Sequence, residues 1–283
     1  MHYVVTGPGY TGRRVLALLS AESAVAIGRS VTDVPSAVRT IACDLDELRD
    51  GLPGLVAPYR LLYTVPPSTA TDGDERLCRF LSALVPRPER FVYLSTTGVY
   101  GDRGGAAVDE NDAPAPRSAR GHRRLAAEER LHRWSDEHGV ALYLLRVPGI
   151  YGPGRLGLDR IRERVPVIRE EDAGPGNRIH VDDLAACAAQ SLQTDAPPGT
   201  YNVGDGDHRS STWFARTVAG CAGLEPPPEV TRREAERTFS AARLSFLKES
   251  RRVSVAKMRD VLGFSPRYAN AEDGIVASLA DEP

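Results

Sequence analysis

The chain has 283 residues, enough for one large domain or two unequal ones with a substantial core. Its formal net charge is −2, which excludes a strongly basic surface for nucleic acid, and no apolar run approaches the length of a membrane span. The N-terminus leads directly into a strand-like segment without a signal-peptide pattern. We therefore expect a cytoplasmic protein with no nucleic-acid or membrane partner.

Strand-like and helix-like segments alternate through the first half of the chain. We expect strands at 2–6, 24–28, 40–44, 60–65, 90–96 and 140–147, and helices at 13–21, about 73–85 and about 117–138. The strand runs are continuously apolar, as expected when helices cover both faces of a sheet. This alternation predicts an α/β fold, a Rossmann doubly wound parallel sheet, whose ligands bind at the carboxyl ends of the strands.

The alternation ends after residue 147. YGPGR (151–155) reads as a loop, and RIHV (178–181) leads into a helix that begins near Asp182, which we expect to cap it. TYNVG (200–204) is a last strand, and the remainder is mostly helical, charged and interrupted by prolines. We expect a dinucleotide-binding domain of residues 1–147 plus 178–205, and a smaller, mostly helical substrate domain of residues 148–177 plus 206–283.

Three glycines, Gly7, Gly9 and Gly12, lie between the first strand and the first helix. This G-x-G-x-x-G spacing at a strand-to-helix turn is the context that a dinucleotide fingerprint requires. The first glycine permits the sharp turn, the second lets a pyrophosphate approach the backbone, and the third lets the helix pack closely on its strand. Tyr10 and Thr11, which lie between the last two glycines, belong to the same predicted site.

Five stretches occur in an order that carries a family resemblance: TGPGYTG at 6–12, STTGVYG at 95–101, LRVPGIYGPGR at 145–155, RIHVDDLA at 178–185 and TYNVG at 200–204. Together they resemble the extended short-chain dehydrogenase/reductase family, which includes NAD(P)-dependent sugar-nucleotide epimerases and dehydratases. The shortened glycine motif is typical of the atypical branch. The resemblance implies a Rossmann domain, a nicotinamide cofactor and a small-molecule substrate.

The end of the second strand bears on the choice of cofactor. NAD enzymes usually place Asp or Glu there to bind the ribose 2′-hydroxyl, whereas this chain has Gly28-Arg29-Ser30. A planar guanidinium suits a 2′-phosphate, so Arg29 predicts NADP(H), with NAD(H) as the second choice. The alternative is that Arg29 is one more surface arginine in a chain with 34 arginines and two lysines.

The resemblance also implies further cofactor-binding residues. Asp44 matches the aspartate that contacts adenine, although a strand-end cap explains it nearly as well. Thr64, Val65 and Pro66, followed by Pro67, line the cofactor's inner ribose, and Pro148 lies near the nicotinamide.

The family's catalytic residues are a Ser or Thr, a Tyr, and a Lys four residues after the Tyr. In this chain Thr96 matches the hydroxyl, and the LAAEE stretch at 125–129 aligns Arg120 with the tyrosine and Arg124 with the lysine. An arginine stays protonated at physiological pH and does not shuttle a proton. The family's usual proton transfer by the Tyr and the Lys is therefore not available with Arg120 and Arg124 at these positions.

Three accounts of Arg120 remain open. In the first, Arg120 and Arg124 polarise a carbonyl or hold an anionic substrate in an oxidoreductase, and the proton comes from elsewhere, with His122, Tyr100 and Tyr151 as candidates. In the second, the protein binds NADP(H) without turnover, as a redox-sensing regulator or scaffold. In the third, the helix is misaligned, although no Tyr lies between Tyr100 and Tyr143.

No metal site is expected from the remaining motifs. The spacing of His180, Asp182 and Asp183 suits one helix face poorly, and the four cysteines are far apart and contain no C-x-x-C pair. We expect the cysteines, Cys43, Cys78, Cys187 and Cys221, to be buried small apolar residues. The charged helix at 117–138 leaves both a monomer and a homodimer open.

Overall fold

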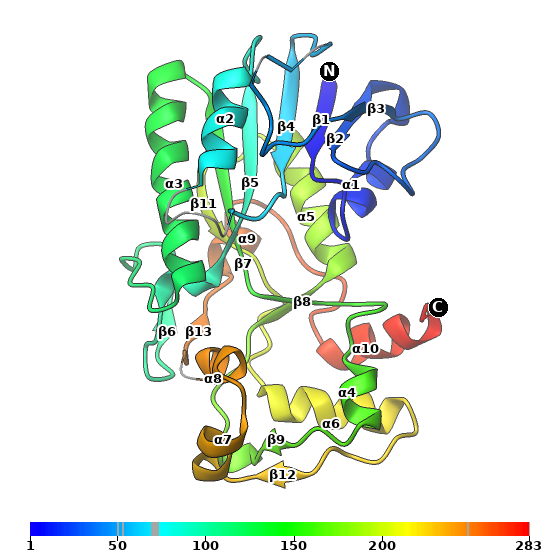
Figure 1. Ribbon diagram of the computed structural model, residues 1–283, viewed down its shortest axis with the longest axis vertical. Helices are drawn as coiled ribbons and strands as arrows, with labels where there is room; N and C mark the ends of the chain where they lie inside the picture. Colours follow the sequence, from blue (N-terminus) through cyan, green and yellow to red (C-terminus); the bar gives the residue numbers. More distant parts are fainter. Residues whose placement is uncertain (50, 53, 69–73, 248, 283) are drawn as a thin grey trace.

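A parallel sheet of seven strands forms the upper part of the molecule in Figure 1. The computed structural model describes residues 1–49, 51–52, 54–68, 74–247 and 249–282. The strands of the sheet are β1 (His2–Thr6), β2 (Ala24–Gly28), β3 (Arg39–Ala42), β4 (Tyr59–Tyr63), β5 (Arg90–Thr96), β7 (Ala141–Val147) and β11 (Gly199–Asn202). They lie in the order β11-β7-β5-β4-β1-β2-β3, and each neighbouring pair is parallel. The strand order reverses between β1 and β4, which is where such sheets bind ligands.

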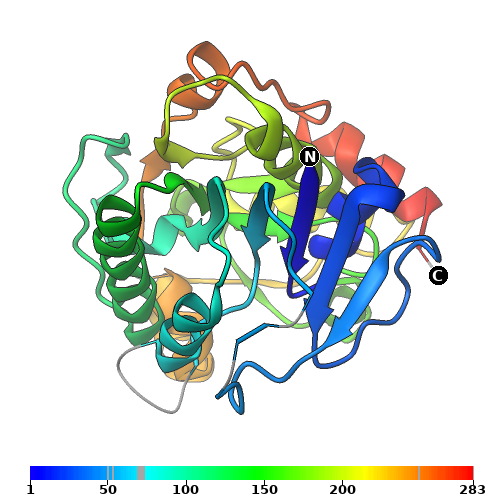
Figure 2. The same cartoon turned by 90° about the horizontal axis from the view of Figure 1, so that it is seen from above.

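Helices cover both faces of the sheet, as the apolar strands predict (Figure 2). Helices α1 (Gly12–Leu18) and α5 (Val181–Gln193) contact each other on one face, and α2 (Glu75–Ala83) and α3 (Ala119–His138) lie on the other. Alternate side chains of one strand enter different apolar clusters: Leu62 packs with Leu16 and Leu184, whereas Leu61 packs with Leu77 and Leu131. The doubly wound Rossmann fold predicted from the sequence is therefore confirmed.

The second half of the chain adds a smaller, mostly helical part below the carboxyl ends of the strands (Figure 1). Its helices are α4 (Leu158–Arg162), α6 (Ser211–Cys221), α7 (Arg232–Thr238), α8 (Ala241–Leu247) and α10 (Ala271–Ala280), whereas α9 (Ala256–Asp260) packs against β11 of the sheet. Three short parallel ladders join distant segments: β8 (Gly149–Tyr151) with β10 (Arg178–His180), β9 (Val167–Ile168) with β12 (Glu229–Val230), and β6 (Ala107–Val108) with β13 (Arg252–Val253). A separate apolar cluster around Tyr151, Ile161, Val218 and Ile275 holds this part together.

Two local predictions need correction. Helix α5 begins at Val181, and its cap is His180, whose Nδ1 accepts a hydrogen bond from the Asp182 backbone N–H at 3.2 Å. The prediction that Asp182 caps this helix is therefore wrong. Cys187 is buried as expected, but Cys221 is exposed, so the prediction for the cysteines holds only in part.

Within the described residues, no helix is both long and apolar enough to cross a membrane. In the same part of the chain, no group of three or more His, Cys, Asp or Glu side chains is arranged to hold a metal ion.

Candidate functional site

The glycine turn between β1 and α1 forms the floor of a groove. Gly7 has a φ of +85°, and a Cβ there would lie 2.7 Å from both Thr64 Oγ1 and Val65 Cγ2. A Cβ on Gly12 would lie 2.7 Å from the Gly7 carbonyl oxygen, so this glycine serves close packing rather than the groove. A Cβ on Gly9, by contrast, would meet nothing within 4 Å. The backbone at Gly9 is thus open to an approaching group, as the pyrophosphate of a dinucleotide requires.

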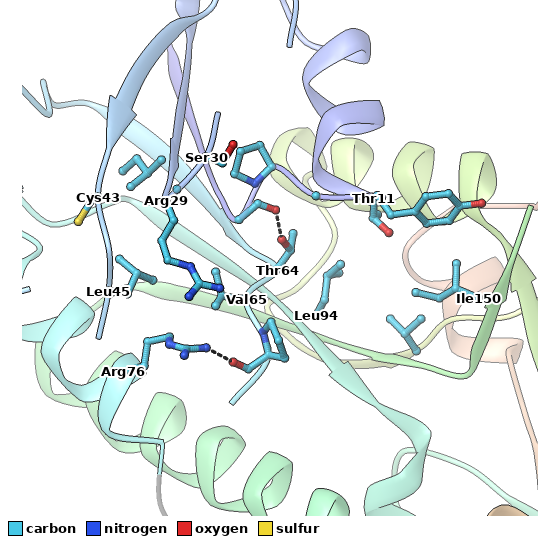
Figure 3. A pocket seen from close by; sticks show the side chains of 18 of the residues that line it. Thr11, Arg29, Ser30, Cys43, Leu45, Thr64, Val65, Arg76, Leu94 and Ile150 are labelled. Atoms are coloured by element: carbon cyan, nitrogen blue, oxygen red, sulfur yellow. Dashed lines mark hydrogen bonds between the residues drawn. The ribbon is translucent and has the colours of Figure 1, made fainter. Parts of the chain in front are cut away.

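A hydroxyl from the neighbouring strand end fixes this turn. Thr64, directly after β4, donates a hydrogen bond to the Gly7 carbonyl oxygen at 2.5 Å (Figure 3). Gly7 N–H in turn donates to the Ile27 carbonyl oxygen of β2 at 2.8 Å. The turn is therefore held by both strands that flank β1.

The groove has a volume of about 570 Å³ and is lined by most of the cofactor-binding residues that the sequence predicts. These are Gly7, Gly9, Tyr10, Thr11, Arg29, Asp44, Thr64, Val65 and Pro66. Pro148, expected near the cofactor, lines a second cavity instead, and its neighbour Val147 lines the groove. The groove runs across the carboxyl ends of the strands, where the fold class predicts a ligand.

One end of the groove carries two arginines from different elements. Arg29 follows β2, and its side chain is 72% exposed and 4.0 Å from the Asp44 carboxylate. Arg76 of α2, which the sequence analysis did not select, donates a hydrogen bond to the Pro66 carbonyl oxygen at 3.0 Å and pairs with Asp46. Figure 3 shows both side chains extending into the same part of the groove. No carboxylate occupies the position that follows β2, where Arg29 stands.

Tyr10 connects the glycine turn to the loop after β8. Its hydroxyl donates to the Pro153 carbonyl oxygen at 2.9 Å, and the guanidinium carbons of Arg14 and Arg155 lie 4.4 and 3.9 Å from its ring centroid. Arg155 also lines the groove and was not selected from the sequence. Its motif, YGPGR, was recognised as a loop, but nothing in that loop indicates that it returns to the first glycine turn.

A second cavity of about 470 Å³ adjoins the groove. The two share four lining residues, namely Ser95, Arg124, Val147 and Ile150. The structure brings all three predicted catalytic residues, Thr96, Arg120 and Arg124, to this second cavity. Arg124 lies at the junction, where its Nη1 donates to the Tyr93 hydroxyl at 2.8 Å and to the Leu94 carbonyl oxygen at 2.9 Å.

The second cavity is rich in positive charge. Its lining includes Arg120 and Arg124 of α3, Arg232 of α7, and Arg251 beside β13, together with the carboxylate of Glu249. Burial lowers the pKa of Arg120, and the nearby Glu249 carboxylate opposes that effect. Even a lowered arginine pKa leaves the group protonated near neutral pH.

The three candidate proton donors named from the sequence lie elsewhere. Tyr100 and Tyr151 are buried in apolar clusters, and His122 is exposed with its Nδ1 3.0 Å from the Ser118 carbonyl oxygen. None of them is among the described residues that line the second cavity.

A buried polar network supports the junction of the two cavities. The Ser95 hydroxyl donates to the carboxylate of Glu128, whose other partner is the guanidinium of Arg146 at 2.7 Å. Both charged side chains are more than nine-tenths buried, at 2% and 7% exposed. Sequence analysis quoted this glutamate only as part of LAAEE and missed its role, because its partners come from β5 and β7.

Comparison with known proteins gives a consistent result. The model of the NAD dependent epimerase/dehydratase family matches residues 68–204. Protein YeeZ of Escherichia coli K12 is 28% identical over 238 residues, covering 79% of this chain and 84% of that protein. A UDP-glucose 4-epimerase of Halalkalibacterium halodurans is 25% identical over 211 residues, covering 65% of this chain and 60% of the epimerase.

Solved structures share the fold over nearly the whole chain. A functionally unknown conserved protein from Silicibacter pomeroyi DSS superposes with a TM-score of 0.80 at 27% identity, covering 99% of this chain and 98% of that one. This chain is therefore similar to the NAD dependent epimerase/dehydratase family over residues 68–204, a little under half of its length. A UDP-glucuronic acid 4-epimerase from Bacillus cereus, solved in complex with NAD, superposes with a TM-score of 0.76 at 18% identity over the same shares of the two chains. The epimerase/dehydratase-like protein thus has the fold of that enzyme, and the resemblance inferred from the five motifs is confirmed.

Proposed function

We propose that this epimerase/dehydratase-like protein is an NADP(H)-dependent oxidoreductase of the atypical short-chain dehydrogenase/reductase type, acting on a small polar or anionic carbonyl or alcohol. The observation that carries the proposal is the junction between the groove and the second cavity at Ser95, Arg124, Val147 and Ile150. A dinucleotide in the groove and a substrate in the second cavity would meet there. When bound, the nicotinamide would supply a hydride donor or acceptor.

The open backbone at Gly9 and the end of β2 support the cofactor assignment. The groove leaves room for a pyrophosphate at Gly9 and offers Arg29 at the place where NAD enzymes usually have a carboxylate. A guanidinium favours the additional phosphate of NADP(H) through charge-assisted hydrogen bonds. NAD(H) is the second cofactor that this groove would accept, since Asp44 lies near Arg29.

The arginines of the second cavity support an anionic or strongly polar substrate. Arg120 and Arg124 stand at the first turns of α3 and would polarise a carbonyl oxygen, which is an electrostatic contribution of the oxyanion-hole kind. Thr96 would orient the same oxygen. Its Oγ1 accepts a hydrogen bond from Gly98 N–H at 3.1 Å, which leaves its own proton to donate.

The arginine at the tyrosine position favours a second candidate, a non-catalytic NADP(H)-binding redox-sensing regulator or scaffold. Arg120 keeps its proton and so removes the family's usual proton relay. The two candidates share the groove and differ only in turnover. A panel of small keto acids, aldehydes and polar ketones that never consumes NADPH would favour the regulator.

Titration with NADPH and with NADH, followed by nicotinamide fluorescence, tests the cofactor assignment. Arg29→Ala should weaken NADPH binding tenfold or more, about 1.4 kcal/mol, and should leave NADH binding nearly unchanged. Arg162→Ala is the matched control, because Arg162 pairs with Asp159 on an exposed helix surface and does not line the groove. Failure of the wild-type protein to bind either nucleotide would overturn both candidate functions.

A further inference from the structure

The second cavity needs a group that can gain and lose a proton. The described residues that line it include no His, Tyr, Cys or Lys, and its four arginines stay charged. Among these residues Glu249 is the one carboxyl group. A carboxyl group is a common general acid or base, whereas Ser and Thr hydroxyls hold their protons tightly unless a base lies beside them. The Ser95 hydroxyl has such a neighbour in Glu128, but that carboxylate lies behind the cavity wall and is already paired with Arg146.

Glu249 lines the cavity shortly before β13, and the next residue, Ser250, fixes its backbone. The Ser250 N–H donates to the Asp102 carboxylate at 3.0 Å. The Ser250 carbonyl oxygen accepts from the N–H groups of Arg103 and Gly105, at 2.9 and 3.0 Å. These three bonds tie Ser250 to the segment after Gly101, which itself follows the STTGVY stretch that carries Thr96. Backbone contacts of the neighbouring Ser250 therefore fix the segment that carries Glu249, which lines the same cavity as Thr96.

The charge around Glu249 is also defined. Its side chain is 8% exposed, and its carboxylate lies 3.1 Å from Nη1 of Arg251, which also donates to the Gly101 carbonyl oxygen at 2.6 Å. Arg120 lines the same cavity, and the negative charge of Glu249 acts to raise the pKa of its guanidinium. The charged groups that line this cavity are thus Arg120 and Arg124 from α3, Arg232 from α7, and Arg251 beside Glu249 itself.

We propose that Glu249 is the proton donor and acceptor that replaces the absent tyrosine in the second cavity. This inference rests on the proposed oxidoreductase function. In alcohol oxidation, the substrate's C–H bond gives its hydrogen and electron pair to the oxidised nicotinamide, while its O–H proton passes to the Glu249 carboxylate and the C=O bond forms. The alcohol is oxidised and the nicotinamide is reduced; in carbonyl reduction the same atoms move in reverse. Arg120 and Arg251 would hold the substrate oxygen and the carboxylate side by side.

Kinetics with Glu249→Gln test the role directly. The variant should lower kcat for a carbonyl that the wild type reduces by about 10²- to 10⁴-fold, with NADPH affinity within about twofold of wild type on the same fluorescence scale. The pH profile of alcohol oxidation by the wild type should contain a limb that is absent from the variant. Glu229→Gln is the matched control, because Glu229 pairs with Arg216 at 3.4 Å and does not line the cavity.

A binding measurement provides a readout without turnover. Oxamate, a small anion with a carbonyl group, should bind among the arginines, and its negative charge beside the Glu249 carboxylate should favour uptake of a proton. Calorimetry in two buffers of different ionisation enthalpy should then detect this proton uptake. The uptake should persist in Glu229→Gln and disappear in Glu249→Gln.

The outcomes separate the two levels of the proposal. A wild type that reduces a carbonyl, with Glu249→Gln within about threefold of its kcat, would overturn the role of Glu249 and leave the oxidoreductase function intact. Equal proton uptake by wild type and Glu249→Gln would overturn that role as well, and so would a wild type that binds no oxamate. A wild type that binds NADPH but turns over no member of the carbonyl panel would overturn the enzymatic function itself, and the role of Glu249 with it.

Discussion

The two adjoining cavities differ in how they are built. The groove is made largely of backbone from one continuous strand-turn-helix unit and from the ends of neighbouring strands. The second cavity takes its charged side chains from α3, from α7 and from the residues before β13, and α3 is far from the other two in the chain. The groove depends on local backbone geometry, whereas the second cavity depends on side chains that only tertiary contacts bring together. The comparison teaches that short-range sequence patterns reveal the groove, while the second cavity becomes recognisable as one site only in the fold.

The largest expected effect concerns the buried ion pair of Glu128 and Arg146, which supports the junction of the two cavities through Ser95. Glu128→Ala should lower the free energy of unfolding by about 3–5 kcal/mol, because it leaves the Arg146 guanidinium buried without its carboxylate. Chemical denaturation measures this loss. Glu129→Ala, at the exposed neighbouring position, should change stability by less than about 0.5 kcal/mol. A Glu128→Ala protein as stable as wild type would show that the junction does not depend on this ion pair.

Two glycine substitutions distinguish the part of the turn that the fold requires from the part that the nucleotide requires. Gly7→Ala should cost about 2–4 kcal/mol of stability, because it combines a positive φ with overlap against Thr64 and Val65. Gly9→Ala should change stability by less than about 1 kcal/mol, since its Cβ meets no other atom, and yet weaken NADPH binding at least tenfold. Thermal unfolding and nucleotide titration distinguish the two effects. Unchanged NADPH binding by Gly9→Ala would contradict the placement of the pyrophosphate.

A pH-dependent prediction concerns Asp205, which lies behind the second cavity beside Pro148. Burial raises the pKa of Asp205 to about 7, from a usual value of 3.8. Between these two values the folded protein holds a proton that the unfolded chain has released, so stability falls as the pH rises from about 4 to about 7.

Asp205→Asn replaces the titrating carboxyl group with a neutral amide, and it keeps a side-chain oxygen that accepts the hydrogen bond from Asp207 N–H. Relative to wild type, the variant should therefore gain on the order of 1–3 kcal/mol between pH 5 and pH 8, as measured by urea denaturation. Parallel pH dependences of the two proteins would contradict the raised pKa.

The sequence was sufficient for the features that depend on local patterns. Continuous apolar strands, the glycine turn and the residue after β2 each follow from short-range chemistry, and the structure places Gly7, Gly9 and Arg29 in one groove. The cap of α5 was misassigned because Asp is a more usual cap than His, and nothing local indicates that His180 turns its Nδ1 to the helix.

Tertiary contacts explain the residues that the sequence did not reveal. Arg76 and Arg155 enter the groove from α2 and from the loop after β8, and Glu249 reaches the second cavity through the pairing of β13 with β6. In a chain with so many arginines, no local signal distinguishes a groove arginine from a surface one. The division into two domains and the choice between monomer and homodimer stay predictions.

The kinetics of Arg29→Ala and Arg120→Ala, measured side by side on one carbonyl that the wild type reduces, test the central claim most directly. The account predicts that Arg29→Ala raises the KM for NADPH tenfold or more at nearly constant kcat. It predicts that Arg120→Ala lowers kcat by about 10²- to 10³-fold and leaves the Kd for NADPH unchanged. If Arg120→Ala instead keeps full turnover, or if both variants lose NADPH binding to the same extent, the assignment of one cavity to the cofactor and the other to the reacting carbonyl is wrong.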